Sequence, residues 1–272
     1  MSAPLLQVED LTLKQGGQSL IDKLSFNINV GECWALLGRN GAGKTTLLHT
    51  LAGVRSAPRD EHQGQIELLG QPLTHWPPRQ RARRVGLLTQ DPSEGFEASV
   101  FEAAQSGRHP YIEPWSDGTA DDEEIVQHAL ATCGLNGFAT RRINSLSGGE
   151  RRRLGIATLL AQNPPLMLLD EPLNHLDLPW QWCILRQLRA LAEQSHGLFI
   201  SLHDPNMARQ GCTHALLILN HGTWLAGRVE DILTRTHLEA LYGLKLRQLE
   251  DDRGAWFVPD IRADMQSPHA PL

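Results

Sequence analysis

The sequence lacks any apolar run long enough to cross a bilayer. A transmembrane helix requires about 20 consecutive apolar residues, and no part of the 272-residue chain approaches that length. The N-terminus, Met1 to Pro4, likewise shows no signal-peptide pattern. We therefore expect a chain that neither spans a membrane nor carries a secretion signal.

The sequence also has few cysteines and no net positive charge. The four cysteines, none of them in C-x-x-C spacing, are expected to be reduced thiols in the core or at the surface. Lys plus Arg number 25 against 31 Asp plus Glu, a formal net charge of −6, which argues against a general nucleic-acid binder. One basic run, Arg151 to Arg153, is expected to form a solvated helix face.

What the sequence does contain is a phosphate-binding loop. Residues 38–45 fit the pattern G-x-x-x-x-G-K-[ST] and lie between an apolar run (34–37) suited to a buried strand and a helical run (45–51). Glycines there let backbone N–H groups converge on an anion at the positive end of the helix. The predicted ATP-binding residues are Gly38, Asn40, Gly41, Ala42, Gly43, Lys44, Thr45 and Thr46.

Two side chains of this loop have individual roles. Lys44 is expected to reach the β- and γ-phosphates, and the Thr45 hydroxyl is expected to bind Mg²⁺. The alternative interpretation is a glycine-rich turn with an exposed lysine. The flanking strand and helix favour the phosphate loop.

A second motif places two carboxylates after an apolar strand. Residues 166–169 are Leu-Met-Leu-Leu, and Asp170 and Glu171 follow. Ligands of open parallel sheets bind beyond the carboxyl ends of the strands, so both acids are expected beside the phosphate loop. Asp170 suits the metal shell, as a Walker B aspartate does, and Glu171 is the candidate to polarise the attacking water. An acidic cap for the next helix is the alternative.

The third motif is Leu146-Ser147-Gly148-Gly149-Glu150. Ser147 and Glu150 have the spacing of a capping box ahead of the helical run 151–162, which is the simpler interpretation. A capping box does not require two glycines, however. Without side chains at positions 148 and 149, the helix N-terminus and the Ser147 hydroxyl can approach a phosphate closely.

This motif resembles the LSGGQ signature of the ATP-binding-cassette (ABC) ATPases, with Glu150 in place of the usual Gln. In that family the signature contacts the γ-phosphate held by the opposite subunit. The resemblance therefore implies ATP contacts by Ser147, Gly148 and Gly149, and a head-to-tail homodimer with two shared sites.

Other elements of that family follow in the expected order. Gln90 resembles the Q-loop glutamine that touches Mg²⁺ and senses the membrane partner, and His203 resembles the switch histidine. Residues 174–177 resemble the D-loop, which makes Asp177 a predicted ATP-binding residue, although Asp177 followed by Pro179 also fits a helix start. The predicted catalytic residues are thus Glu171, His203 and Gln90, and the predicted metal ligands are Thr45, Gln90 and Asp170.

One family feature is missing. Cassettes usually carry an aromatic residue that stacks on adenine near residues 13–17, and this chain has Gln15 there. A stacked ring contributes on the order of 1 kcal/mol beyond its buried area. We therefore assign no adenine-stacking residue.

The resemblance also implies the fold class: α/β, a P-loop NTPase of ABC type. We expect a mixed, largely parallel sheet core, an antiparallel N-terminal β portion to about residue 75, and an inserted helical subdomain at about 91–162 that holds an amphipathic helix at 121–130. The ABC ATPase domain is predicted to span 2–244. Residues 245–272 are predicted to form a C-terminal hairpin and tail.

Weaker features concern the cargo. Residues 107–111, residues 174–178 and the C-terminal hairpin resemble importers of iron chelates, haem and cobalamin, whereas the exporter pattern before the signature is absent from 140–145. Such an importer implies an integral membrane permease, an extracytoplasmic substrate-binding protein, and a peripheral location on the cytoplasmic face of the membrane. The alternatives are another transporter, an ABC ATPase acting on nucleic acid, and a regulatory module without turnover.

Overall fold

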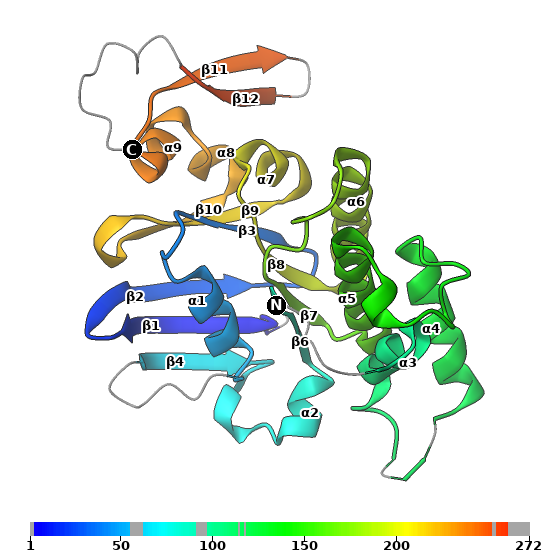
Figure 1. Ribbon diagram of the computed structural model, residues 1–272. Coiled ribbons are helices and arrows are strands. Elements are labelled where there is room, and N and C mark those ends of the chain that lie inside the picture. The colour runs from blue at the N-terminus through cyan, green and yellow to red at the C-terminus, as the bar shows by residue number, and fades with distance from the viewer. Residues whose placement is uncertain are drawn as a thin grey trace.

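The computed structural model describes residues 3–54, 62–90, 97–113, 115–116, 118–251 and 254–260. Figure 1 shows two sheets stacked beside one group of helices, with a small hairpin at the C-terminal end. None of the helices in these ranges is both long and apolar enough to cross a membrane.

A six-stranded sheet forms the centre of the molecule, in the order β10-β9-β3-β8-β7-β6. All of its neighbouring strands are parallel except β10, which runs antiparallel to β9. Every residue of β3, β7 and β8 is buried, as expected for parallel strands covered on both faces. The strands are β3 (Cys33–Gly38), β6 (Val85–Leu88), β7 (Leu166–Leu169), β8 (Gly197–Ser201), β9 (His214–Ile218) and β10 (Trp224–Arg228).

The second sheet is antiparallel and comes from the N-terminal part of the chain, in the order β2-β1-β4-β5. Its strands are β1 (Leu6–Gln15), β2 (Gln18–Ile28), β4 (His62–Leu68) and β5 (Gln71–Pro72). The helix α1 (Lys44–Leu51) lies between the two sheets, where Leu47, Leu48 and Leu51 are fully buried in a core shared with both. The position of α1 fixes the loop before it at the end of β3.

The helices α3 (Val100–Gln105), α4 (Ala120–Thr132) and α5 (Gly148–Gln162) lie to one side of the central sheet. The predicted helix at 121–130 falls within α4. A capping box starts each of these helices, at Ser99, Thr119 and Ser147 respectively. Short 3-10 turns are η2 (Ser106–Arg108) and η3 (Ile143–Ser145). This arrangement accounts for the described part of the predicted helical insert.

The basic run Arg151–Arg153 is not a solvated face, so this prediction was wrong. Arg152 is 4% exposed and Arg153 is 9% exposed. Arg153 donates to the carbonyls of Cys133 and Gly134 and lies over the Trp180 ring, and Arg152 donates to carbonyls at the ends of β6 and β7. Because carbonyls at the ends of helices and strands can lack a donor within their own element, long cationic side chains reach them.

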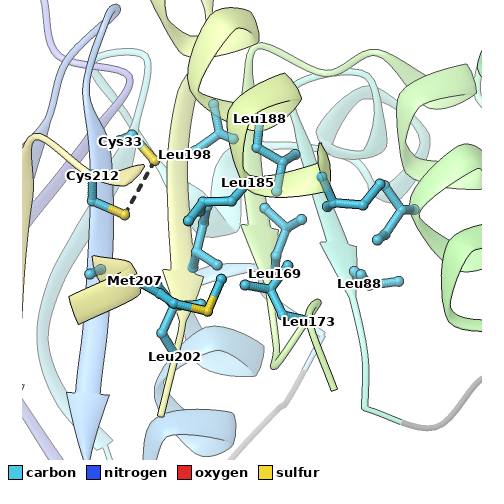
Figure 2. Packing of buried hydrophobic residues seen from close by; sticks show 14 of the residues in the cluster. Cys33, Leu88, Leu169, Leu173, Leu185, Leu188, Leu198, Leu202, Met207 and Cys212 are labelled. Carbon is cyan, nitrogen blue, oxygen red and sulfur yellow. Dashed lines mark hydrogen bonds between the residues drawn. The ribbon is translucent and has the colours of Figure 1, made fainter. Parts of the chain in front are cut away.

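The remaining helices surround the sheet. They are η1 (Leu73–His75), α2 (Pro78–Ala82), α6 (Leu178–Ser195), α7 (Pro205–Gly211), η4 (Asn220–Gly222), α8 (Val229–Ile232) and α9 (Arg235–Tyr242). Leu185 and Leu188 of α6 pack in the same core as Leu169 and Leu198 of the sheet, and Figure 2 shows these side chains together. Beside them, the thiols of Cys33 and Cys212 lie 3.6 Å apart and are not bonded as a disulfide.

A two-stranded hairpin, β11 (Leu246–Asp251) and β12 (Gly254–Pro259), ends the described chain. It is held to α7 by the Asn206 side chain, which donates to the Phe257 carbonyl and accepts from the Phe257 N–H. The predicted tail falls at 261–272, outside the described residues. The division at residue 244 stays a prediction.

Candidate functional site

The phosphate loop lies where β3 ends at Gly38 and α1 begins at Lys44. Gly43 is the N-cap of α1 with φ of 94°, a left-handed conformation that favours glycine, and it offers no side chain to cap the helix. The first backbone N–H groups of α1 therefore face the loop without a side-chain acceptor from the N-cap. Such amides at the positive end of a helix suit a phosphate group.

Lys44 is folded back into its own loop. Its Nζ atom donates to the Gly38 carbonyl at 2.8 Å, and the residue is only 6% exposed. Burial lowers the pKa of Lys44, while the nearby carboxylates of Glu171 and Asp170 oppose that shift. The ammonium group is thus a poorly hydrated cation beside the loop, which favours an anionic partner.

Asp170 follows β7 and is fully buried. Its Oδ2 atom accepts from the Thr45 hydroxyl at 2.6 Å, and its Oδ1 atom accepts from the Ser201 hydroxyl at 2.7 Å. The contact between Thr45 and Asp170 joins the phosphate loop to the end of β7. Two of the three residues that the sequence assigns to the metal ion are therefore in direct contact.

Glu171 bends the chain out of the strand. Its φ is 49°, and its backbone N–H donates to Ser201 Oγ at 2.7 Å. The Oε1 atom lies 2.9 Å from His203 Nε2, and Oε2 accepts from the Asn174 amide. Both oxygens of the predicted catalytic carboxylate are thus held by protein groups.

These residues surround one cavity of about 490 Å³. It is lined by Gln15, Asn40, Gly41, Ala42, Gly43, Lys44, Thr45, Thr46, Gln90, Glu171, Asn174 and His203. No Phe, Tyr or Trp is among these described lining residues, and Gln15 occupies the position where the family has an aromatic ring. Gly38 and Asp170 lie behind the lining, in contact with Lys44 and Thr45 respectively.

The signature residues do not line this cavity in the described chain. Ser147 is the N-cap of α5 and exchanges two hydrogen bonds with Glu150, so the simpler capping interpretation is observed. A Cβ atom on Gly149 would lie 2.9 Å from the His175 carbonyl, whereas one on Gly148 would make ordinary contacts. Gly149 is therefore needed for packing within the chain, and Gly148 lies exposed at the start of the helix.

Asp177 is likewise a helix cap. Its Oδ1 atom accepts from the Trp180 N–H at the start of α6. Like the signature, Asp177 is absent from the lining of the cavity among the described residues. The nucleotide contacts predicted for Ser147, Gly148, Gly149 and Asp177 stay predictions that a second copy of the chain would have to satisfy.

Three residues of the site were missed from the sequence: Asn174, Ser201 and Arg152. Asn174 and Ser201 are polar residues beside the ends of apolar strands, one three positions after Glu171 and one two positions before His203. A polar residue at such a strand end is a sequence signal that could have identified both as site residues. No sequence signal marks Arg152, because its acceptors are main-chain carbonyls distant in sequence.

The donor set fits ATP and a hard divalent cation. A hydroxyl (Thr45), a carboxylate (Asp170) and an amide (Gln90) are oxygen ligands of the kind that Mg²⁺ prefers alongside phosphate oxygens. Open helix amides and a buried ammonium suit the phosphates.

Comparison with known proteins finds relatives among the ATP-binding proteins of ABC transporters. A family model described as ABC transporter matches residues 21–174. The hemin import ATP-binding protein HmuV of Pseudomonas entomophila is 36% identical over 92% of this chain and 97% of its own length. The ferric enterobactin transport ATP-binding protein FepC of Escherichia coli is 34% identical over 92% of this chain and 91% of its own.

A solved structure of a metal-chelate type ABC transporter in an inward-facing conformation is similar too. It is 30% identical with a TM-score of 0.81, and the match covers 96% of this chain and 99% of that one. The predicted fold class is thus confirmed: an ABC-type P-loop fold with parallel strands and an antiparallel N-terminal sheet.

Proposed function

This chain is an ATP-hydrolysing member of the ABC transporter family, and we propose that it powers the import of an iron chelate or haemin through a separate membrane permease. The observation that carries the catalytic part is the single cavity shared by Lys44, Thr45, Gln90, Glu171 and His203. The cargo part rests on the functions of the hemin and enterobactin relatives, which match over nearly their whole length.

In the proposed reaction, Lys44 and the loop amides hold the β- and γ-phosphates of ATP. Mg²⁺, held by Thr45, Asp170 and Gln90, would neutralise phosphate charge. Glu171 orients or deprotonates water, whose oxygen attacks the γ-phosphorus as the bond to ADP breaks. His203 stabilises charge on the transferred group.

The contact between Glu171 and His203 suggests how the γ-phosphate controls this reaction. Oε1 of Glu171 lies 2.9 Å from His203 Nε2, so this oxygen is paired with the proposed switch histidine. A γ-phosphate that attracts His203 would release Oε1 for the attacking water. Hydrolysis would then depend on the presence of the γ-phosphate.

We further propose a head-to-tail homodimer with two shared sites. One chain supplies the phosphate loop and Glu171 to the cavity, with Asp170 behind the lining, while Ser147, Gly148 and Gly149 of that chain lie outside its lining. The open N-terminus of α5 at Gly148 would meet the γ-phosphate held by a second copy.

A second cavity is the proposed docking site for the permease. A cavity of about 720 Å³ lies between α3, α5 and β6, and its lining includes Leu87, Ala103, Leu154 and Leu159 together with Thr89, the neighbour of Gln90. A segment of the permease seated there would sit next to the Q-loop. The chain would then lie at the cytoplasmic face of the membrane, with an extracytoplasmic binding protein delivering the cargo on the other side.

The test of the ATPase part is Glu171→Gln. This variant is expected to bind ATP, to form a stable dimer with ATP on size exclusion, and to hydrolyse ATP at a rate near zero. Glu193→Gln, on the exposed end of α6, is the matched control and should hydrolyse ATP as the wild type does. A Glu171→Gln variant with substantial turnover would refute the assigned role.

The test of the cargo is uptake in the native host lacking this gene. Complementation by the wild type, but not by Glu171→Gln, should restore uptake of labelled haemin or of a labelled ferric siderophore. Restoration of cobalamin uptake alone would assign the third cargo expected from the sequence. Unchanged uptake of all three would refute import of this class while leaving the ATPase result intact.

A further inference from the structure

Ser201 occupies a buried position between the two predicted carboxylates of the site. It is the last residue of β8 and is 0% exposed. In the ladder between β7 and β8, Leu169 pairs with Ile200. Ser201, the residue after Ile200, therefore lies level with Asp170, the residue after Leu169. The side chain therefore reaches both residues that follow β7.

The single hydroxyl of Ser201 makes two different hydrogen bonds. It donates its proton to Asp170 Oδ1 at 2.7 Å and accepts the backbone N–H of Glu171 at 2.7 Å. A serine hydroxyl has one proton to donate, and here it is committed to the carboxylate. The direction of both bonds is thus determined by chemistry.

The bond to Asp170 orients that carboxylate. With Oδ1 occupied by Ser201, Oδ2 is turned towards Thr45, whose hydroxyl donates to it at 2.6 Å. Both groups belong to the set assigned to the metal, which also includes Gln90. Loss of the Ser201 bond would allow the Asp170 carboxylate to rotate about its last torsion.

The bond to Glu171 stabilises an unusual backbone. Glu171 has φ of 49°, which residues with a Cβ atom rarely adopt, and its N–H donates to the Ser201 side chain instead of a backbone carbonyl. Such a conformation persists only where surrounding groups hold it. It directs the Glu171 side chain into the cavity, where its Oε1 meets His203.

We propose that Ser201 is a positioning residue for ATP hydrolysis, one hydroxyl that fixes the metal-binding Asp170 and the water-activating Glu171 relative to each other. The inference rests on the roles proposed above for those two residues. Ser201 itself is not among the described residues that line the cavity. Its effect is therefore transmitted through the orientation of its partners.

Ser201→Ala tests the proposal. The turnover number should fall about 10- to 100-fold, as is typical when a group behind a metal ligand is removed. The Mg²⁺ concentration for half-maximal rate should rise several-fold. Binding of a fluorescent ATP analogue without divalent metal should be unchanged, because Lys44 and the loop amides are untouched.

A readout independent of turnover is metal binding in a non-hydrolysing complex. Binding of Mn²⁺ in the presence of a non-hydrolysable ATP analogue, followed by electron paramagnetic resonance, should be several-fold weaker in Ser201→Ala. If that variant does not fold, Ser201→Cys keeps nearly the same size but donates weakly, and the same two shifts are expected.

Thr213→Val is the matched control. Its hydroxyl likewise accepts a backbone N–H, that of Cys33 at 3.0 Å, at the opposite end of the sheet, and it lies 3.1 Å from the Cys33 carbonyl and 2.9 Å from His214 Nδ1. The control should cost stability without moving the Mg²⁺ dependence or Mn²⁺ binding.

Two outcomes would overturn the proposal: wild-type turnover and metal dependence in Ser201→Ala, or the same changes in Thr213→Val. The result for Glu171→Gln separates this failure from that of the proposed function. An inactive Glu171→Gln with a normal Ser201→Ala refutes only the role of Ser201. An active Glu171→Gln refutes the assignment on which the role of Ser201 rests.

Discussion

The guanidinium group of Arg152 donates to the main-chain carbonyl of Asp170 in the interior of the protein. The same group donates to the Thr89 carbonyl at 2.6 Å. Arg152 belongs to α5, the helix that begins at the signature, and its acceptors lie at the ends of β6 and β7. One side chain thus joins α5 to the segment after β6, which leads to Gln90, and to the segment after β7, which holds Asp170.

Replacing Arg152 with Ala should destabilise the protein by about 2–4 kcal/mol, because buried carbonyls would lose their donor. Urea unfolding measures this loss. Arg186→Ala, an exposed arginine on α6, is the control and should stay within about 0.5 kcal/mol of the wild type. Equal stability of the two variants would contradict the structural role of Arg152.

Gly134→Ala should be strongly destabilising for a reason of space. A Cβ atom there would overlap the Trp180 ring, and φ is 64°. Gly137 has a similar φ of 76°, but a Cβ atom added to it would have nothing within 4 Å. Gly137→Ala should therefore cost only about 1 kcal/mol of backbone strain, and Gly134→Ala about 2 kcal/mol more. Thermal unfolding of both variants separates strain from overlap, and similar losses would show that Trp180 can move aside.

The ion pair of Arg108 with Asp122 makes the stability of the fold depend on pH in the acidic range. Their closest atoms are 2.8 Å apart, and the hydrogen bond from Arg108 is the main cause that lowers the pKa of Asp122. A lowered carboxyl pKa stabilises the fold above the unfolded value, about 3.9, and this contribution is lost as the pH falls through the folded value. As the pH falls from about 5 to about 2, the free energy of unfolding should decrease less in Asp122→Asn than in the wild type. Urea unfolding across this range measures it, and a wild-type dependence on pH in Asp122→Asn would contradict the contribution of this ion pair.

Tyr242 links the C-terminal part of the chain to His203, the proposed switch histidine. Its hydroxyl donates to the His203 carbonyl at 3.1 Å, and burial, with a smaller effect of Asp204, raises the pKa of Tyr242. Tyr242→Phe should keep the packing of the ring and lower the ATPase rate roughly two- to fivefold, the effect of about 0.5–1 kcal/mol for one neutral hydrogen bond. ATP binding should be unchanged. A wild-type rate in this variant would show that the His203 carbonyl needs no such support.

The local patterns of the sequence were sufficient for the ABC-type fold and for the neighbourhood of Lys44, Asp170 and Glu171. Glycine spacing determines a phosphate loop because the backbone angles it needs are closed to other residues. An apolar run followed by acids determines the edge of a parallel sheet because the ligand side of such sheets is fixed. Both features depend on residues adjacent in the chain.

Only the tertiary structure decided the burial of Arg152 and Arg153, the bridge made by Ser201, and the separation of Ser147 from the cavity. The first two depend on main-chain carbonyls or amides contributed by distant segments, such as Thr89 for Arg152 and Glu171 for Ser201. Every residue carries such groups, so the sequence does not mark which of them a side chain will meet. Packing of the helices against the sheet makes that choice.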